Sequence, residues 1–267
     1  MDRSRRKPTD SLDAYTLYLR GLTRLSGHRD RQAIEEALRL FKHAIELDPE
    51  FASAYGRAAY CYAELKGNGW FSDQPDEIAE VSRIARRAIE LGRDDAAVTA
   101  PGGWAIGYVA RDLELAAALL DRALILNPNL AEAWVCGGFV KAWLGEPKAA
   151  IERFARGMRL TPVGFHIRGM RVGMAHAHFF LGEDDKAASW AGLALQDNPD
   201  FQSGLRISAA SNAMAGQLEQ AHKSLARLRQ LHPALRVSKL KGVLGPYRRA
   251  EDLARYEEGL RRAGLPE

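Results

Sequence analysis

The stretch AEAWVCGGFVKAWLGEPKAAIERFARGMRLTP, residues 131–162, decides the fold. It contains two segments of helical length, and Gly145 between them suits the end of a helix before a tight turn. Small residues at Gly138 and Ala150 let two antiparallel helices approach closely, while large side chains such as Phe154 fill the space between neighbouring pairs. The stretch therefore predicts a helix-turn-helix unit.

A short pattern with a central proline recurs on both sides of this unit. It reads DPEF at 48–51, NPNL at 127–130, NPDF at 198–201 and HPAL at 232–235, with TPVG at 161–164 as a weaker copy. The last four prolines are 34, 37 and 34 residues apart. The longer first interval holds two units, because AIELGR at 88–93 repeats AIELDP at 44–49 with Arg93 in place of proline. A period near 34 residues indicates a repeat protein built from helical pairs.

This period predicts the helices and their grouping. The six predicted pairs span residues 12–47, 52–92, 95–127, 131–160, 165–197 and 202–231. An insertion at 66–77 lengthens the turn of the second pair, and Pro101 followed by two glycines predicts that the third pair has a kinked or late-starting first helix. The predicted domains are a flexible basic segment at 1–11, a helical array at 12–233, and a loop with a capping helix at 234–267.

The repeat unit at 131–162 resembles the tetratricopeptide repeat. The matching residues are Trp134, Gly138, Gly145, Ala150, Phe154 and Pro162, whereas Lys141 and Gly157 depart from the pattern. The resemblance implies an all-α, right-handed solenoid of about six helical hairpins, closed by the C-terminal helix.

Four further stretches resemble the carboxy-terminal region of bacterial multidomain signalling proteins. They are LDAYTLYLRGL at 12–22, the run at 36–56, the aromatic-bearing insertion at 66–77 and EGLRRAGLPE at 258–267. In those proteins a class III adenylate cyclase or a winged-helix DNA-binding domain precedes the repeats. The resemblance implies an effector domain upstream of Met1, and no residue here corresponds to the metal-binding aspartates or the recognition helix of such a domain.

Composition excludes several classes of protein. The net charge is +4 over 267 residues, which is a mild basic bias rather than the concentrated charge of a dedicated nucleic-acid binder. Only two cysteines are present, so we expect no disulfide framework and a cytoplasmic location. No apolar stretch is long enough to span a membrane, and the first ten residues lack the apolar segment of a secretory signal, so we expect none.

The sequence contains no motif for catalysis, a cofactor or a metal. A phosphate-binding loop pattern is absent. His166, His176 and His178 are the nearest approach to a metal cluster, but a spacing of two places the last pair on different faces of a helix. We therefore expect a protein that is not an enzyme.

The tetratricopeptide resemblance places the first helix of each pair on a concave face. Carrying over its inward positions gives a predicted partner-binding groove of Tyr60, Trp104, Tyr108, Phe139, Trp143, His176, Phe179, Phe180 and Met214. Large apolar residues at helical spacing are also the ordinary content of a core, so each residue has a packing interpretation as well. If Trp143 lines an open groove, its replacement by alanine leaves stability nearly unchanged, whereas Trp134 packs between helices and its replacement unfolds the array.

These observations predict a non-catalytic module that binds a protein or peptide partner, or an attached effector domain, through the groove. One alternative is the C-terminal region of an adenylate cyclase or winged-helix regulator. The other is a nucleic-acid-binding helical repeat, which we disfavour because basic residues such as Arg83 and Arg87 alternate with Glu80 and Glu90.

Overall fold

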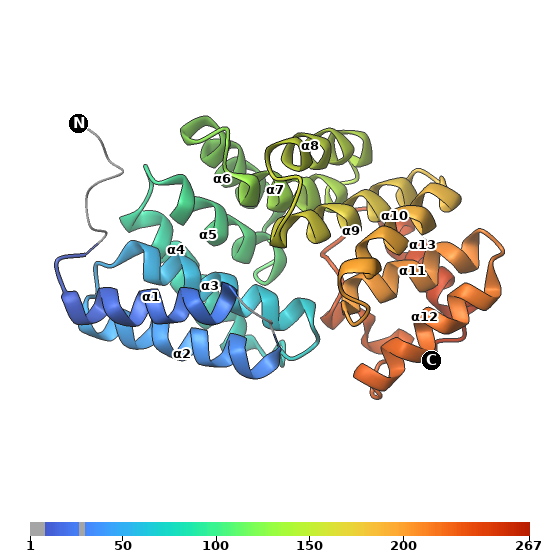
Figure 1. The fold of residues 1–267 in the computed structure, drawn as a ribbon, viewed down its shortest axis with the longest axis horizontal. Coiled ribbons are helices and arrows are strands. Elements are labelled where there is room, and N and C mark those ends of the chain that lie inside the picture. The colour runs from blue at the N-terminus through green and yellow to red at the C-terminus, as the bar shows by residue number, and fades with distance from the viewer. Residues whose placement is uncertain (1–8, 27–29) are drawn as a thin grey trace. The chain divides into compact units, whose positions relative to one another are not determined.

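The computed structural model describes residues 9–26 and 30–267. Residues 1–8, most of the segment predicted to be flexible, lie outside the described residues. Within the described ranges the chain forms α-helices, one 3-10 helix and no strand (Figure 1). The predicted all-α class is therefore confirmed.

The helices follow one another as hairpins. The first three are α1 (Leu12–Ser26) with α2 (Arg31–Leu47), α3 (Ala52–Gly67) with α4 (Pro75–Leu91), and α5 (Ala96–Tyr108) with α6 (Leu113–Leu126). The next three are α7 (Ala131–Trp143) with α8 (Pro147–Leu160), α9 (Phe165–Phe180) with α10 (Asp184–Asp197), and α11 (Gln202–Met214) with α12 (Leu218–Leu231). The 3-10 helix η2 (Val237–Gly242) and α13 (Ala250–Arg262) complete the chain. Each hairpin matches the range predicted from the repeat.

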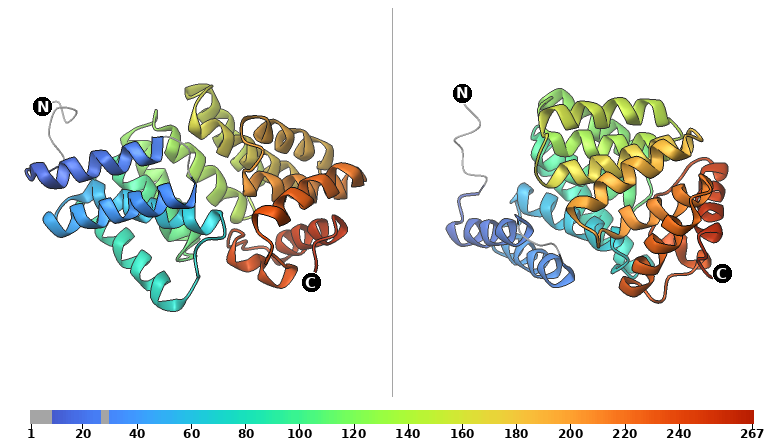
Figure 2. Two further views of the ribbon diagram at one scale, coloured as in Figure 1. Left: turned by 60° about the horizontal axis from the view of Figure 1, so that its bottom comes forward. Right: turned by 45° about the vertical axis from the view of Figure 1, so that its right-hand side comes forward.

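The chain divides into two compact units, which we describe separately. The first ends at Pro128 and the second begins at Asn129, with Gly67–Gly69 grouped with the second. The first unit contains the hairpins α1–α2, α3–α4 and α5–α6. The second contains the hairpins α7–α8, α9–α10 and α11–α12, followed by η2 and α13, and its C-terminal residues appear in orange and red in Figure 2.

Glycines set the turns inside the hairpins of the second unit. Gly145, Gly182 and Gly216 have φ angles of 80°, 76° and 78°, in the left-handed region that glycine adopts without strain. All three directly follow the last turn of a first helix, as the sequence predicts. Proline at the first position of α8, Pro147, then starts the second helix without losing a hydrogen bond.

The first helix of the third hairpin excludes one of the two alternatives expected for it, the late start. Asp95 caps α5 by accepting the N–H of Ala97 at 2.8 Å, so the helix begins before Pro101 and does not start late. Proline inside a helix is costly, but α5 is buried between α4 and α6, and this packing outweighs the local preference. The two glycines allow the approach: a Cβ on Gly103 would lie 3.0 Å from the Cβ of Leu119.

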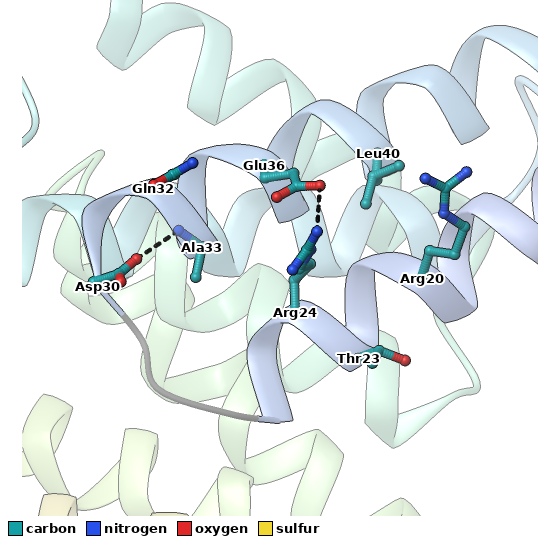
Figure 3. Close-up of a pocket in the computed structure, with 8 residues that line it drawn as sticks. All are labelled: Arg20, Thr23, Arg24, Asp30, Gln32, Ala33, Glu36 and Leu40. Carbon is teal, nitrogen blue, oxygen red and sulfur yellow. Dashed lines mark hydrogen bonds and ion pairs between the residues drawn. The ribbon is translucent and has the colours of Figure 1, made fainter.

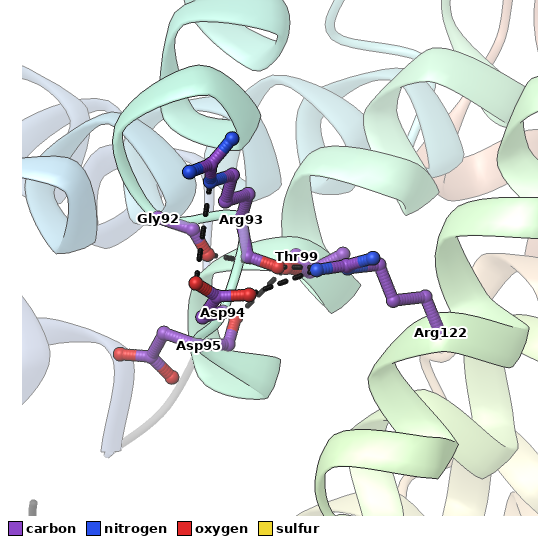
Figure 4. Close-up of polar contacts among 6 residues, drawn as sticks. All are labelled: Gly92, Arg93, Asp94, Asp95, Thr99 and Arg122. Atoms are coloured by element: carbon purple, nitrogen blue, oxygen red, sulfur yellow. Dashed lines mark hydrogen bonds and ion pairs between the residues drawn. The ribbon is translucent and has the colours of Figure 1, made fainter.

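Polar contacts hold the turn that lacks the recurring proline (Figure 4). Arg122 of α6 donates from Nε to the carbonyl of Arg93 at 2.9 Å and from Nη2 to Asp94 at 2.8 Å. In the second unit, Arg227 of α12 bonds both carboxylate oxygens of Asp200, at 2.6 and 2.7 Å, in the turn before α11. A second-helix arginine therefore fastens the turn between hairpins in each unit.

Candidate interaction surface

We use the term first-helix face for the surface formed in each unit by the first helices of its hairpins. In the second unit these helices are α7, α9 and α11, and α9 contacts both of the others. Six of the nine predicted groove residues lie on them: Phe139 and Trp143 on α7, His176, Phe179 and Phe180 on α9, and Met214 on α11.

Five of these six residues form one continuous aromatic cluster. The ring centroid of Phe139 lies 5.9 Å from that of Trp143 and 6.0 Å from that of His176. His176 continues to Phe180 at 6.2 Å, and Phe180 to Phe179 at 5.7 Å. We call these five residues the aromatic cluster. Their tilted and edge-on arrangement is the favourable geometry for aromatic rings.

The other predicted groove residues lie in the first unit. Trp104 and Tyr108 of α5 are neighbours, with ring centroids 5.2 Å apart. Tyr60 of α3 carries the guanidinium of Arg57 at 5.7 Å from its ring. Tyr60 and Tyr108 are buried, whereas Trp104 is half-buried and so keeps part of its ring accessible.

Comparisons with known proteins agree with this architecture. No protein-family model matches the chain, and no curated protein does. A tetratricopeptide repeat protein from Parabacteroides merdae aligns over 95% of this chain and 99% of its own, with 15% identity and a TM-score of 0.52. This chain has the tetratricopeptide-repeat fold.

Two other solved structures share that fold arrangement. PilW, a widely conserved type IV pilus biogenesis factor, aligns over 84% of this chain and 96% of its own, with 17% identity and a TM-score of 0.58. A structure of the APC/C hetero-tetramer Cut9–Hcn1 aligns over 94% of this chain and 43% of its own, with 16% identity and a TM-score of 0.67. At these identities the likeness is one of fold.

In this tetratricopeptide-repeat chain the aromatic cluster is covered by the chain's own C-terminal segment, residues 234–267. Trp143 is only 4% exposed, and its carbonyl accepts the N–H of Arg248 at 2.8 Å. The cluster's other end meets Tyr256 of α13, whose ring lies 5.4 Å from that of His176 and 5.6 Å from that of Phe179. Helix α13 packs against α11, the first helix of the last hairpin.

This arrangement changes the expectation for Trp143. The repeat pattern predicts that Trp143 lines an open groove. In the structure its indole packs against the backbone at Gly245, where even a Cβ would overlap the ring. Replacement of Trp143 therefore removes packing. Met214 is half-buried and packs against the same core as the cluster.

Three residues that sequence reasoning did not assign to the site contribute to it. Tyr247 lies 5.0 Å from Phe180 in an edge-on contact, and Tyr256 joins the cluster. Arg255 stacks its guanidinium 4.8 Å over the ring of Phe179. The only signal in the sequence was the helical spacing of Tyr256 and Leu260, which form a narrow apolar face on the predicted capping helix.

The imidazole of His176 is buried within the cluster. Its Nδ1 lies 2.9 Å from the carbonyl of Val172, and the side chain is 5% exposed. Burial lowers the pKa of His176 from 6.5 to about 4, and the positive charge of Arg206 contributes in the same direction. The residue is therefore neutral at physiological pH and serves as packing.

We expect this histidine to make stability fall in mild acid. Because the folded pKa is depressed, the unfolded chain takes up the proton first, and stability is lost as pH falls from about 6.5 to about 4. The full loss is about 3 kcal/mol. Urea unfolding at several pH values measures this loss, and the dependence of stability on pH should be clearly weaker in His176→Gln than in His178→Gln. Part of the dependence should remain, because burial also lowers the pKa of His232. An unchanged slope in His176→Gln would contradict the assignment.

Other features of the described residues offer no competing chemistry. A cleft of about 570 Å³ lies between α1 and α2, where Arg24 pairs with Glu36 at 3.0 Å and Asp30 caps α2 (Figure 3). No group of three or more potential metal-ligating side chains occurs in residues 9–26 and 30–267. Over the same ranges, no helix combines the length and apolar character needed to cross a membrane.

Proposed function

We propose that this chain is a non-catalytic interaction module that binds a peptide or helix of a partner protein on its first-helix faces. The observation that carries the proposal is the C-terminal segment itself. The first-helix face of the second unit holds a helix through aromatic contacts and directed polar bonds, which are the elements of helix-in-groove recognition.

The nine predicted groove residues form the basis of this proposal. In the second unit, His176, Phe179 and Phe180 contact Tyr256 of α13. In the first unit, Trp104 supports the proposal because it is a large aromatic residue that is partly accessible. Tryptophan and tyrosine provide much of the energy of protein interfaces, since they combine a large apolar area with few rotatable bonds.

The basic residues of the chain support this choice over nucleic-acid binding. Arg83 and Arg87 of α4 form ion pairs with Glu80 and Glu90, at 3.2 and 3.3 Å, one helical turn away. Paired charges on a solvated helix face do not present the uncompensated positive surface that phosphates require.

An attached effector domain is the second candidate for the partner. Its support is the resemblance of residues 12–22, 36–56, 66–77 and 258–267 to signalling proteins that carry a cyclase or winged-helix domain, and a cytoplasmic location belongs to the same proposal. The genomic sequence upstream of Met1 tests it, because an in-frame domain of either type would identify the partner as a covalent one.

A peptide-display selection against the purified full chain tests the proposed function. Peptides selected by the intact protein should bind Trp104→Ala at least about 30-fold more weakly, as expected for loss of a central aromatic contact. Ile125→Ala is the matched control, because Ile125 lies on α6 of the same hairpin and is 82% exposed. Equal binding to all three proteins, or failure to select any peptide, would refute the proposal.

A further inference from the structure

The inner side of α13 is shaped to fit the first-helix face of the second unit. Tyr256 and Leu260 are fully buried, one helical turn apart. Gly259 lies between them in sequence and faces α11 closely: a Cβ there would be 3.0 Å from both the carbonyl oxygen and the Cβ of Ala210. A larger residue at this position would hold the two helices apart.

Arg255 gives the contact its direction. Its Nη2 bonds both carboxylate oxygens of Asp184 at 2.6 and 2.7 Å, and its Nε donates to the carbonyl of Phe179 at 3.0 Å. The guanidinium also stacks on the Phe179 ring. Arginine suits such a site because its planar group combines hydrogen bonding with stacking. The segment Arg255–Leu260 therefore binds the face through a specific pattern, Arg-Tyr-x-x-Gly-Leu.

The contact of α13 with the first-helix face also includes one destabilising feature, a buried carboxylate. Asp252 is 4% exposed, and its Oδ2 makes no hydrogen bond. The nearest cationic group is the Nε of Arg249 at 3.7 Å, and burial raises the pKa of the carboxyl. A buried carboxylate oxygen without a hydrogen bond destabilises the docked state, and this cost disappears when α13 moves into water.

Ion pairs on the outer side of α13 favour a helix that stays folded after release from the first-helix face. Glu258 pairs with Arg262 at 2.7 Å and with Arg261 at 3.2 Å, within the same helix. Such pairs one turn apart support helix without help from tertiary contacts. The preceding residues, 243–249, form no regular helix, and their contacts with the face, such as the bond from the N–H of Arg248 to the carbonyl of Trp143, belong to the same docked segment.

We propose that the C-terminal segment is a latch that occupies the first-helix face of the second unit until a partner helix replaces it. The partner helix carries an arginine followed directly by an aromatic residue, and a glycine three positions after the aromatic residue. This inference rests on the proposed function and specifies the partner of that same face. The latch reduces the apparent affinity for such a helix, because the partner must compete with a ligand that is always present in the same molecule.

A synthetic peptide of residues 247–265, carrying a fluorophore at its amino terminus, tests the latch by fluorescence anisotropy with the full-length chain. Arg255→Glu in the protein weakens the latch but leaves Asp184 and Phe179 intact, so it should bind the peptide at least about tenfold more tightly than the wild type. Asp252→Ala removes the buried carboxylate, so it should hold the latch more firmly and bind the peptide several-fold more weakly. Ala254→Gln, at an exposed position of α13, should behave like the wild type.

Hydrogen exchange of residues 250–262 in the same variants reports whether the latch has opened. Faster exchange in Arg255→Glu together with tighter peptide binding supports the proposal. Faster exchange without peptide binding would show that the contacts do not define a ligand, and unchanged exchange in both Arg255→Glu and Asp252→Ala would show that the segment is a fixed part of the core. Either result overturns the latch but leaves the peptide selection with Trp104→Ala unaffected.

Discussion

Trp143→Ala should lower the free energy of unfolding by about 3–5 kcal/mol, as large-to-small aromatic substitutions in cores do. The indole is 4% exposed and lies between Phe139 and the backbone at Gly245. Its removal leaves a cavity beneath the C-terminal segment, and the segment cannot close over it without moving η2 and α13. Denaturant unfolding followed by circular dichroism measures the loss.

Trp134→Ala is the matched comparison. Trp134 is one of the residues that match the repeat pattern, but its side chain is half-buried, so its removal should cost less than that of Trp143. This order reverses the one expected for an open groove. A cost below about 1 kcal/mol for Trp143→Ala, with a larger one for Trp134→Ala, would show that the C-terminal segment does not cover the indole in solution.

The helices were predictable because the repeat encodes each of them locally. Small residues such as Ala150, turn glycines such as Gly145 and the recurring proline act over a few residues, and neighbouring copies of the unit confirm one another. The late start that was one alternative for the helix at Pro101 does not occur, because tertiary packing outweighs local preference there. That helix is enclosed by α4 and α6, and the sequence near the proline contains no information about this enclosure.

The position of the C-terminal segment was not predictable in the same way. Residues 234–249 carry no repeat, so no neighbouring copy indicates where they lie. The capping of the last hairpin by α13 was predicted, but the inner side of α13 mixes Asp252 and Gly259 with Tyr256 and Leu260. This mixed pattern does not indicate that the helix also reaches the aromatic residues of α9. The contacts to Trp143 and Phe179 join residues more than 70 positions apart, which only the folded chain brings together.

For the nine groove residues, the sequence predicted the position on the first helices but not the segment that covers the aromatic cluster. Their grouping on the first helices follows from the repeat, and the structure joins five of them in one aromatic cluster. Whether a partner binds there depends on what lies above the cluster, and that information resides in Tyr247, Arg255 and Tyr256. The sequence pattern of the repeat does not extend to these residues.

Phe154→Ala should also destabilise the second unit by about 3–5 kcal/mol, because it empties the contact between three helices. Phe154 of α8 is fully buried, and its ring fits between two glycines, Gly138 of α7 and Gly173 of α9. A Cβ built on either glycine would overlap the ring. The repeat therefore places one large side chain between two glycines, so neither α7 nor α9 has a side chain there that can fill the space that alanine leaves.

A double-mutant cycle separates this fit from simple burial. Gly173→Ala alone should cost about 1–3 kcal/mol through overpacking, but much less in a Phe154→Leu background, where the shorter side chain leaves room for the new methyl group. Gly192→Ala, on α10 with open space where its new methyl group would lie, should cost nothing or stabilise that helix slightly. Additive costs for Gly173→Ala and Phe154→Leu would mean that the ring does not occupy the space between the two glycines, and the close packing of α7, α8 and α9 would need another explanation.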